Sequence, residues 1–152
     1  IGMAFKLSQR SLSKLHGVNP MLNRVVHDAI IKTTVDFGVT EGLRSLERQK
    51  QLLKQKRSQT LKSKHITGHA VDLVAYIDGE VCWEVEVYDE IADAVKASAK
   101  AIGCPIKWGA GWHKNLTDHD GTSEELMNEY IDLRRSQNRR PFIDCPHFEM
   151  AI

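Results

Sequence analysis

The sequence contains few of the residues that mark fibrous, disordered or disulfide-rich proteins. Glycine and proline together account for 14 of 152 residues, and the three cysteines, Cys82, Cys104 and Cys145, are an odd number at unrelated spacings. No stretch approaches 18 uninterrupted apolar residues, so the sequence predicts no membrane span. Collagen-like, low-complexity and disulfide-framework proteins are therefore excluded, and the cysteines predict a reducing compartment.

An N-terminal basic region followed by an apolar run, the pattern of a secretory signal, is also missing. We therefore expect no signal peptide, with Met3 as the natural start and the first two residues as a remnant of cloning. Hydrophobic residues make up 41% of the 152 residues, which is enough for one buried core without disulfides. The sequence predicts a soluble globular protein with a single domain over residues 1–152.

A net charge of +1 hides a strong asymmetry between the two halves of the chain. Residues 1–76 carry 13 Lys and Arg against 5 Asp and Glu, whereas residues 77–152 carry 8 against 15. Eight of the basic residues lie between Arg44 and Lys64, a pattern typical of a surface that meets a polyanion or of a solvated helix face. The stretch holds no interleaved aromatic residues, so we do not expect nucleic acid as the partner.

Cap and turn signals divide the sequence into alternating helices and strands. Helices are predicted from Asn19-Pro20 onward, from Ser45 to about Lys56, from about Tyr88 to a left-handed cap at Gly103, and after the capping box Thr122–Glu125. Strands are predicted at 37–40, 106–108 and 148–152, with a β-hairpin from Ala70 to Trp83 that turns at Asp78-Gly79. This order predicts an α+β fold with a mainly antiparallel sheet flanked by helices.

The segment from Ser63 to Asp72 is the richest in chemistry. His65 and Asp72 are seven residues apart, about 23 Å in an extended chain at roughly 3.3 Å per residue, so they can share a metal ion only if the chain turns between them. Gly68 permits such a turn. Asp72 lies inside an apolar strand, where a carboxylate is costly to bury and needs a cation or several donors.

A second group lies near the end of the chain, where His147 stands between Asp144 and Glu149. Two histidines and one carboxylate leave the fourth position of a zinc ion open for water, as in catalytic zinc sites. Spacing alone leaves open whether any one histidine is a ligand or a hydrogen-bonded structural residue. His69, His113 and His119 are further histidines of this kind, and the loop around the last two lacks the ligand positions of an EF-hand.

Taken in order, the motifs resemble a known family. The chain reads Ser63-x-His65-x-x-Gly68-x-Ala70-x-Asp72, preceded by Gly42-x-Arg44-Ser45-x-x-x-Gln49 and followed by Trp108-Gly109 and Asp144-x-x-His147-x-Glu149. This pattern is similar to the zinc D-Ala-D-Ala carboxypeptidase family, also called VanY-like, and within it to the phage L-alanyl-D-glutamate peptidases. Two features depart from it: many relatives have Asp where this chain has Gly111, and the stretch from Gly121 to Arg140 is longer than usual.

The resemblance implies a hedgehog/D-Ala-D-Ala-peptidase-like fold that binds one Zn²⁺ per chain. The implied zinc ligands are His65, Asp72 and His147. Asp144 would be the general base and Arg44 a transition-state stabiliser. Ser63, Gln49, Glu149 and Trp108 would support the ligands or bind substrate, although Trp108 and Trp112 could equally belong to the core.

The same resemblance implies an endolysin that hydrolyses the L-Ala–D-Glu amide bond of peptidoglycan stem peptides and causes host lysis. Such an enzyme would accumulate in the host bacterial cytoplasm as a monomer and reach the cell wall through a separate membrane lesion. The basic 44–64 segment would aid contact with anionic envelope polymers, and no separate cell-wall-binding domain is expected. Two alternatives remain: a D-Ala-D-Ala carboxypeptidase or dipeptidase, and a non-catalytic, zinc-stabilised binding module.

Overall fold

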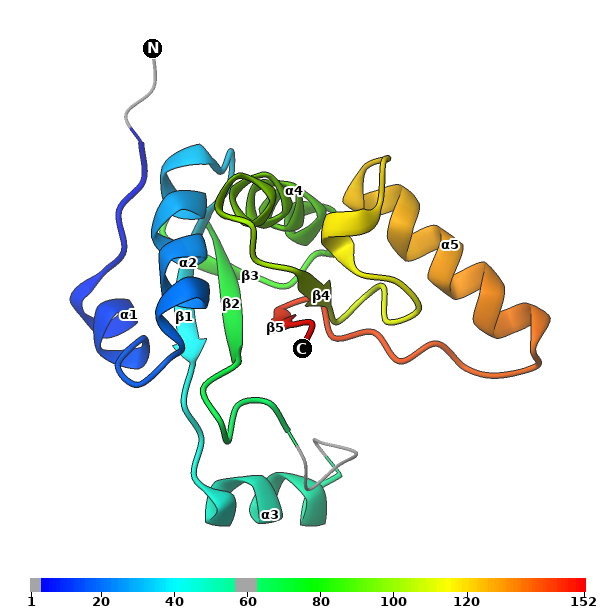
Figure 1. Ribbon diagram of the computed structural model, residues 1–152, viewed down its shortest axis with the longest axis horizontal. Coiled ribbons are helices and arrows are strands. Elements are labelled where there is room, and N and C mark those ends of the chain that lie inside the picture. The colour runs from blue at the N-terminus through cyan, green and yellow to red at the C-terminus, as the bar shows by residue number, and fades with distance from the viewer. Residues whose placement is uncertain (1–3, 57–62) are drawn as a thin grey trace.

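A five-stranded antiparallel sheet forms the centre of the molecule. The computed structural model describes residues 4–56 and 63–152 (Figure 1). The strands run in the spatial order β1-β2-β5-β4, with β3 paired to β2 outside this path. Their bounds are β1 Asp36–Glu41, β2 Ala70–Ile77, β3 Glu80–Cys82, β4 Ile106–Trp108 and β5 His147–Met150. All four strand pairs are antiparallel, which confirms the predicted fold class.

Helices precede the first strand and lie between later strands along the chain. Their bounds are α1 Gln9–Lys14, α2 Pro20–Lys32, α3 Leu46–Lys54, α4 Val85–Ile102 and α5 Ser123–Ser136, with a 3-10 helix η1 at Leu116–Asp118. The predicted caps form as expected: the Asn19 side chain accepts from the amide of Met21, and Gly103 ends α4 with φ at 84°. No helix within the described residues is both long and apolar enough to cross a membrane.

Several predicted boundaries differ from the structure. Helix α1 was not expected from the sequence, although Ser8 caps it by accepting a hydrogen bond from the amide of Ser11; a six-residue helix is too short to show a clear apolar period. Helix α4 begins at Val85 instead of about Tyr88, and α3 ends at Lys54. β5 begins at His147 and ends before the last two residues.

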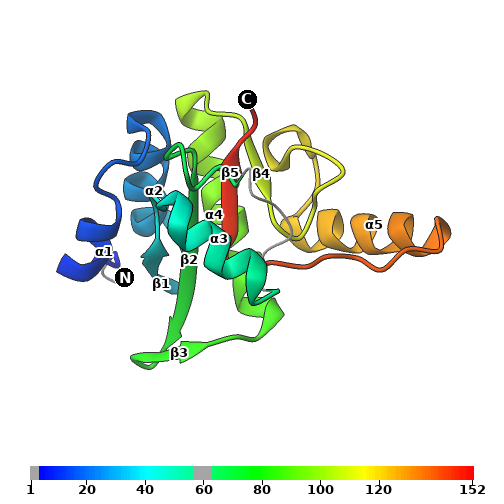
Figure 2. The same ribbon diagram turned by 90° about the horizontal axis from the view of Figure 1, so that it is seen from below.

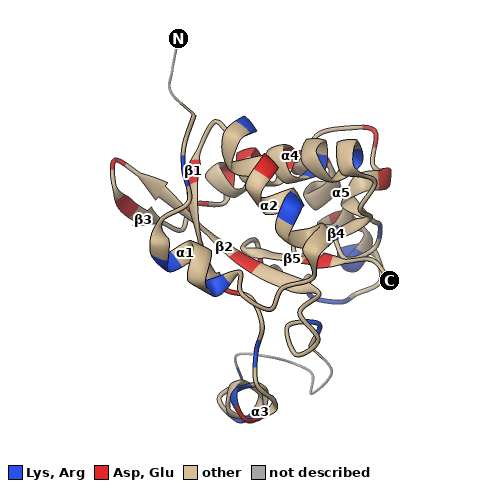
Figure 3. Cartoon of the chain, turned by 60° about the vertical axis from the view of Figure 1, so that its left-hand side comes forward, with Lys and Arg blue, Asp and Glu red and all other residues tan. Residues whose placement is uncertain are grey.

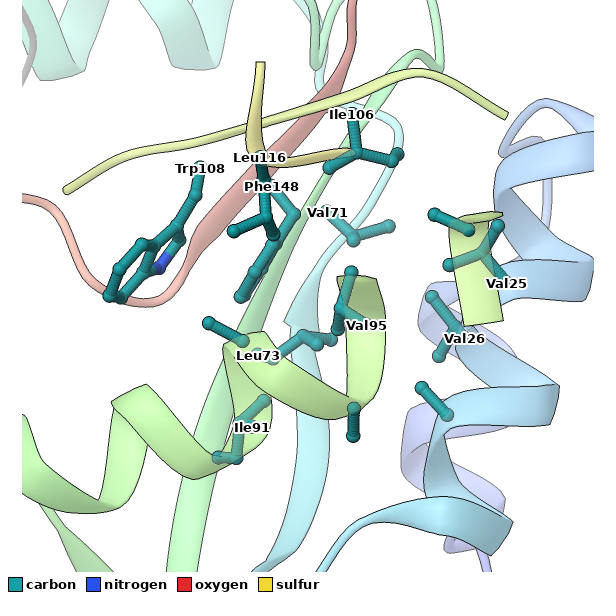
Figure 4. Close-up of a cluster of buried hydrophobic side chains, with 14 of the residues drawn as sticks. Val25, Val26, Val71, Leu73, Ile91, Val95, Ile106, Trp108, Leu116 and Phe148 are labelled. Carbon is teal, nitrogen blue, oxygen red and sulfur yellow. The ribbon is translucent and has the colours of Figure 1, made fainter. Parts of the chain in front are cut away.

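The hydrophobic core lies between one face of the sheet and two helices. Figure 4 shows Leu73 of β2 and Phe148 of β5 among the side chains directed toward Val95 of α4 and Val26 of α2. All four of these side chains are at most 2% exposed. Their burial fixes which face of the sheet is turned inward, because neighbouring side chains along a strand point to opposite faces.

The opposite face of the sheet carries polar side chains. Phe148 faces the core, so its neighbours His147 and Glu149 face away from it, and Asp72 lies directly opposite His147 in the β2–β5 pair. Figures 1 and 2 place α3 on this side of the sheet, away from α4. The fold therefore brings the chemistry-bearing residues of β2 and β5 together on one surface.

Candidate metal centre

His65, Asp72 and His147 meet on the polar face of the sheet. Asp72 Oδ1 lies 3.1 Å from His65 Nε2 and 3.1 Å from His147 Nδ1. One ligand atom from each of the three residues lies within 4.8 Å of the others, so the group could hold a metal ion. It is the one such group of three found among residues 4–56 and 63–152.

A turn over residues 64–68 brings His65 back toward Asp72. Gly68 in this turn has φ at +78°, a conformation that favours glycine. The turn is held in place by a hydrogen bond from the amide of Asn19 to the carbonyl of Gly68, 2.8 Å long. The predicted reversal of the chain between the first histidine and Asp72 is therefore confirmed.

In both histidines, the outer ring nitrogen, which points away from Asp72, already makes a hydrogen bond; the inner nitrogen faces Asp72. His65 Nδ1 lies 2.8 Å from the carbonyl oxygen of Gly42, and His147 Nε2 lies 2.9 Å from Glu149 Oε1. Because both partners are acceptors, each outer nitrogen must carry a hydrogen. In a neutral ring the inner nitrogen then carries none, so two lone pairs converge on the Asp72 carboxylate. Only a cation between them, a metal ion or a proton, satisfies all three groups.

The charges around Asp72 show the same need for a cation. Burial works to raise the pKa of Asp72, but its contacts with the rings of His147 and His65 outweigh burial and hold the pKa well below its usual range. Burial lowers the pKa of His147, yet its bonds to Asp72 and Glu149 raise that pKa to about 9. A protonated His147 thus supplies the positive charge when no metal is bound, and the donor set fits a metal ion that replaces this proton.

Arg44 lies behind the carboxylate of Asp72 and is 8% exposed. Its Nε and Nη2 donate to the two carboxylate oxygens of Glu41, and Nη1 donates to Gln49 Oε1 and, at 3.4 Å, to Ser63 Oγ. Nη2 also lies 3.8 Å from Asp72 Oδ2. These contacts fix the guanidinium in one orientation. Among its hydrogen bonds, the one to Ser63 is long.

Asp144 borders the same site from the loop before β5. Its amide donates to the carbonyl of Gly109, and its own carbonyl accepts from the amide of His147. Burial raises the pKa of the Asp144 carboxyl, and the negative charge of Asp72 raises it further, against the lowering effect of His147, His65 and Arg44. A carboxyl group with a raised pKa is suited to exchanging protons near neutral pH.

A cleft of about 1280 Å³ opens above these residues. One wall comes from the end of α1 and from the chain around α3, including Lys14 and Arg48. The opposite wall comes from Trp112, the α5 residues Tyr130 and Arg134, and the loop before β5. His65, Asp72, Asp144 and His147 all line it. The candidate ligands are therefore accessible to a bound molecule.

The remaining predicted site residues divide into three near the ligands and one in the core. Ser63 Oγ accepts from the amide of His65, and Glu149 bridges His147 and Lys64. Gln49 is buried against Arg44. Trp108 is 0% exposed and does not line the cleft; it stacks on Phe148 and donates from Nε1 to the carbonyl of Cys145 at 2.7 Å.

Three contacts of the site involve groups to which the sequence motifs assign no role. They are the carboxylate of Glu41 on Arg44, the carbonyl of Gly42 on His65, and the ring of Trp112, whose centroid lies 5.5 Å from that of His147. The first two follow an irregularity of β1 between Val39 and Glu41. No spacing rule finds such a bulge, because it depends on the partner strand.

Other sequence expectations fall outside the centre. His69 bonds to Thr67, and His113 bonds to Glu129. Gly111, the departure from the family pattern, packs so closely on Leu126 of α5 that a Cβ there would lie 2.8 Å from two of its carbons. Residues 57–62 of the basic 44–64 segment lie outside the described residues.

Known proteins resemble this chain over most of its length. The profile of a family described as phage L-alanyl-D-glutamate peptidase matches residues 3–151. The L-alanyl-D-glutamate peptidase of Escherichia phage T5 is 31% identical over 122 residues, which cover 78% of this chain and 89% of that protein. The crystal structure of the Serratia marcescens L-Ala D-Glu endopeptidase ChiX superposes with a TM-score of 0.71 at 35% identity, covering 96% of this chain and 90% of that one.

Both relatives are peptidases named for the same bond, and the match to the family extends over nearly the whole chain, including every residue of the candidate centre. The protein is a peptidase that belongs to the phage L-alanyl-D-glutamate peptidase family.

Proposed function

We propose that the protein binds one zinc ion through His65, Asp72 and His147 and uses it to hydrolyse the L-Ala–D-Glu amide bond of peptidoglycan stem peptides. The observation that carries the proposal is the orientation of the two rings: each donates its outer nitrogen to an acceptor and turns its inner nitrogen toward one carboxylate oxygen. Imidazole and carboxylate ligands of this number suit zinc, and three protein ligands leave a position for water.

Held by these three residues, a zinc ion would supply a water with a pKa lowered to about 7 and a positive charge that would polarise a carbonyl group. Asp144 is the group we assign to proton transfer. It borders the cleft, and its raised pKa lets the carboxylate accept a proton from the attacking water and release it again. The proton then passes to the nitrogen of D-Glu as the C–N bond breaks, which gives a free carboxylate on L-Ala and a free amine on D-Glu.

Arg44 is assigned to stabilising the negative charge that develops on the carbonyl oxygen. Its charge is permanent, and its bonds to Glu41 and Gln49 hold the guanidinium beside Asp72. The long contact from Nη1 to Ser63 marks the N–H that a substrate oxygen can recruit. Glu149 and Ser63 are assigned to orienting the histidines, the first through the ring of His147 and the second through the backbone of His65.

In the biological setting, we propose an endolysin that meets its substrate after a separate membrane lesion admits it to the cell wall. The binding partner is the stem peptide in the cleft, with anionic envelope polymers as a second contact for the basic 44–64 segment. Lys14 of α1 and Arg48 of α3 line the cleft from the same side, and Figure 3 shows basic positions on both helices. A positive wall would attract such polymers over a Debye length of about 8 Å at physiological salt.

Digestion of purified Gram-negative peptidoglycan tests the proposal. We expect the zinc-loaded protein to release fragments with free N-terminal D-Glu and intact glycan, as read by mass spectrometry. Asp144→Ala should lower the rate at least 100-fold while zinc content, measured by atomic emission, stays near one per chain. The exposed Asp132→Ala on α5 serves as the matched control. Release of D-Ala instead would indicate a carboxypeptidase, and bound zinc without cleavage would indicate a binding module.

A further inference from the structure

The bond assigned above makes a specific demand on the cleft. D-Glu has two carboxyl groups, and a stem peptide needs only one of them to continue the chain beyond this residue. The other remains as a free carboxylate close to the bond that is cut. A buried or half-buried carboxylate needs a cation or several hydrogen-bond donors. A cation in the cleft that the protein's own carboxylates have not already neutralised is therefore the group best suited to receive this carboxylate of D-Glu.

Five Lys and Arg side chains line the cleft, and two of them are occupied. Arg44 is held by both oxygens of Glu41. Lys64 donates to the carbonyl of Met150 and lies 3.2 Å from Glu149 Oε2. Lys64 cannot bind a substrate carboxylate strongly without giving up Glu149 or the Met150 carbonyl. The one loosely held N–H of Arg44, toward Ser63, is already assigned to the carbonyl oxygen of the bond that is cut. The remaining three are Lys14, Arg48 and Arg134.

Among these three, Arg134 is the one whose charged group is already oriented. It is half-buried on the last turn of α5, and its Nε and Nη2 donate to the carbonyl of Arg140 at 3.1 and 3.0 Å. Within the described part of the chain, no carboxylate lies within ion-pair distance of it. The N–H groups of Nη1 therefore remain available to a ligand. Binding would cost little side-chain entropy, because the guanidinium is already held in one orientation.

A continuous wall connects Arg134 to the candidate metal ligands. The ring of Trp112 contacts that of His147, stacks on Phe142 at 6.2 Å between centroids, and donates from Nε1 to the Phe142 carbonyl. Tyr130, one helical turn before Arg134, receives the Phe142 amide on its hydroxyl oxygen. Arg48, by contrast, stands on α3 across the cleft, and Lys14 is exposed on α1.

We infer that Arg134 binds the free carboxylate of the D-Glu residue and so determines the preference for a D-Glu stem over an amidated one. The inference rests on the proposed function, because it takes the L-Ala–D-Glu bond as the site of cleavage. It assigns a specificity role to α5, the helix that brings Tyr130 and Arg134 to the cleft. Arg134 takes no part in bond breaking and acts by positioning the substrate.

Two synthetic stem peptides test the inference, identical except that one carries D-Glu and the other carries D-isoglutamine, in which the free carboxylate is an amide. With zinc-loaded wild-type protein we expect kcat/KM to be about 10- to 100-fold higher for the D-Glu peptide, the effect of one charged hydrogen bond. Arg134→Gln should abolish this ratio by lowering kcat/KM on the D-Glu peptide alone. Arg134→Lys, which keeps the charge without the fork, should retain part of it.

Two control variants complete the design. Arg135→Gln removes an exposed charge from the same helix outside the cleft and should leave both rates unchanged. If Arg48→Gln abolishes the ratio and Arg134→Gln does not, the carboxylate binds the opposite wall and the inference is wrong. Equal losses on both peptides in Arg134→Gln would show a structural role through the Arg140 carbonyl and would also overturn it. Absence of cleavage of either peptide by the wild type would refute the proposed function itself.

Discussion

Replacement of Asp89 by Asn should make the protein more stable at pH 8 but not at pH 4. Asp89 lies in the first half of α4 and is 8% exposed, and its Oδ1 is buried without a hydrogen-bond partner. Burial, the main cause, and the nearby carboxylates of Glu124, Asp93, Glu86 and Glu90 together raise the pKa of this carboxyl to about 7. The folded protein therefore resists ionisation of a group that ionises freely near pH 4 when unfolded.

The direction of the pH dependence follows from the number of protons bound. Between about pH 4 and pH 7 the folded chain holds a proton on Asp89 that the unfolded chain has lost, so the free energy of unfolding falls as pH rises and levels off above 7. Roughly three pKa units at about 1.4 kcal/mol each set an upper limit near 4 kcal/mol. Of the two carboxylate oxygens, Oδ1 alone is both buried and without a hydrogen-bond partner. Solvent screening at Oδ2 therefore lowers the expected gain in unfolding free energy on substitution to about 1–2 kcal/mol.

Urea unfolding of metal-free wild type and Asp89→Asn at pH 4, 6 and 8, followed by tryptophan fluorescence, measures this gain. The difference in unfolding free energy should grow from a few tenths of a kcal/mol at pH 4 to about 1–2 kcal/mol at pH 8, or several degrees in Tm. The exposed Asp132→Asn should show no such growth. A difference that stays the same at all three pH values would refute the reasoning, because it would show that the charge on Asp89 costs nothing.

Three further outcomes are expected at the metal centre. Glu149→Gln should weaken zinc affinity 10- to 100-fold in a competition assay with a chelating dye, because His147 loses its charged partner; unchanged affinity would contradict this role. Gly109→Ala should lower the free energy of unfolding in urea by about 2–4 kcal/mol, because the added Cβ would overlap the Asp144 carbonyl. A variant as stable as the wild type would argue against that contact. Chelation should lower the Tm, and zinc at 1,000 times its Kd should restore the Tm by raising the unfolding free energy by about 4 kcal/mol, as calorimetry can test.

The parts of the fold that the sequence predicts are those fixed by local chemistry. Asn19 caps its helix, Gly103 ends another in a left-handed conformation, and Asp78-Gly79 turns the hairpin with both residues at positive φ. Each of these depends on a few neighbouring residues. Helix α1 was not predicted because contacts with a distant part of the chain stabilise it. The Ser11 hydroxyl is buried against β1 and accepts a hydrogen bond from the amide of Val39.

The candidate site also has a part that local sequence predicts and a part that depends on the fold. The residue types that could bind a metal are visible in the sequence, because Asp72 inside an apolar strand requires compensation wherever the strand lies. Its pairing with His147, 75 residues away, depends on the β2–β5 register, and that register follows from burying Phe148 and Val71 on the inner face. The apolar residues of these strands thus decide which polar ones meet.

The orientation of the ligands is the part that no local pattern contains. His65 and His147 each have two ring nitrogens, and which one faces Asp72 is decided by an acceptor on the far side: a main-chain carbonyl at Gly42 for the first ring, and the Glu149 carboxylate for the second. A carbonyl is present at every residue, so its role at Gly42 has no signature in the sequence. The two rings use opposite nitrogens toward Asp72, Nε2 in His65 and Nδ1 in His147. Loss of either acceptor would leave that ring free to carry its hydrogen on the nitrogen that faces Asp72. The centre therefore depends as much on the strand that carries Gly42 as on the residues that would bind the metal.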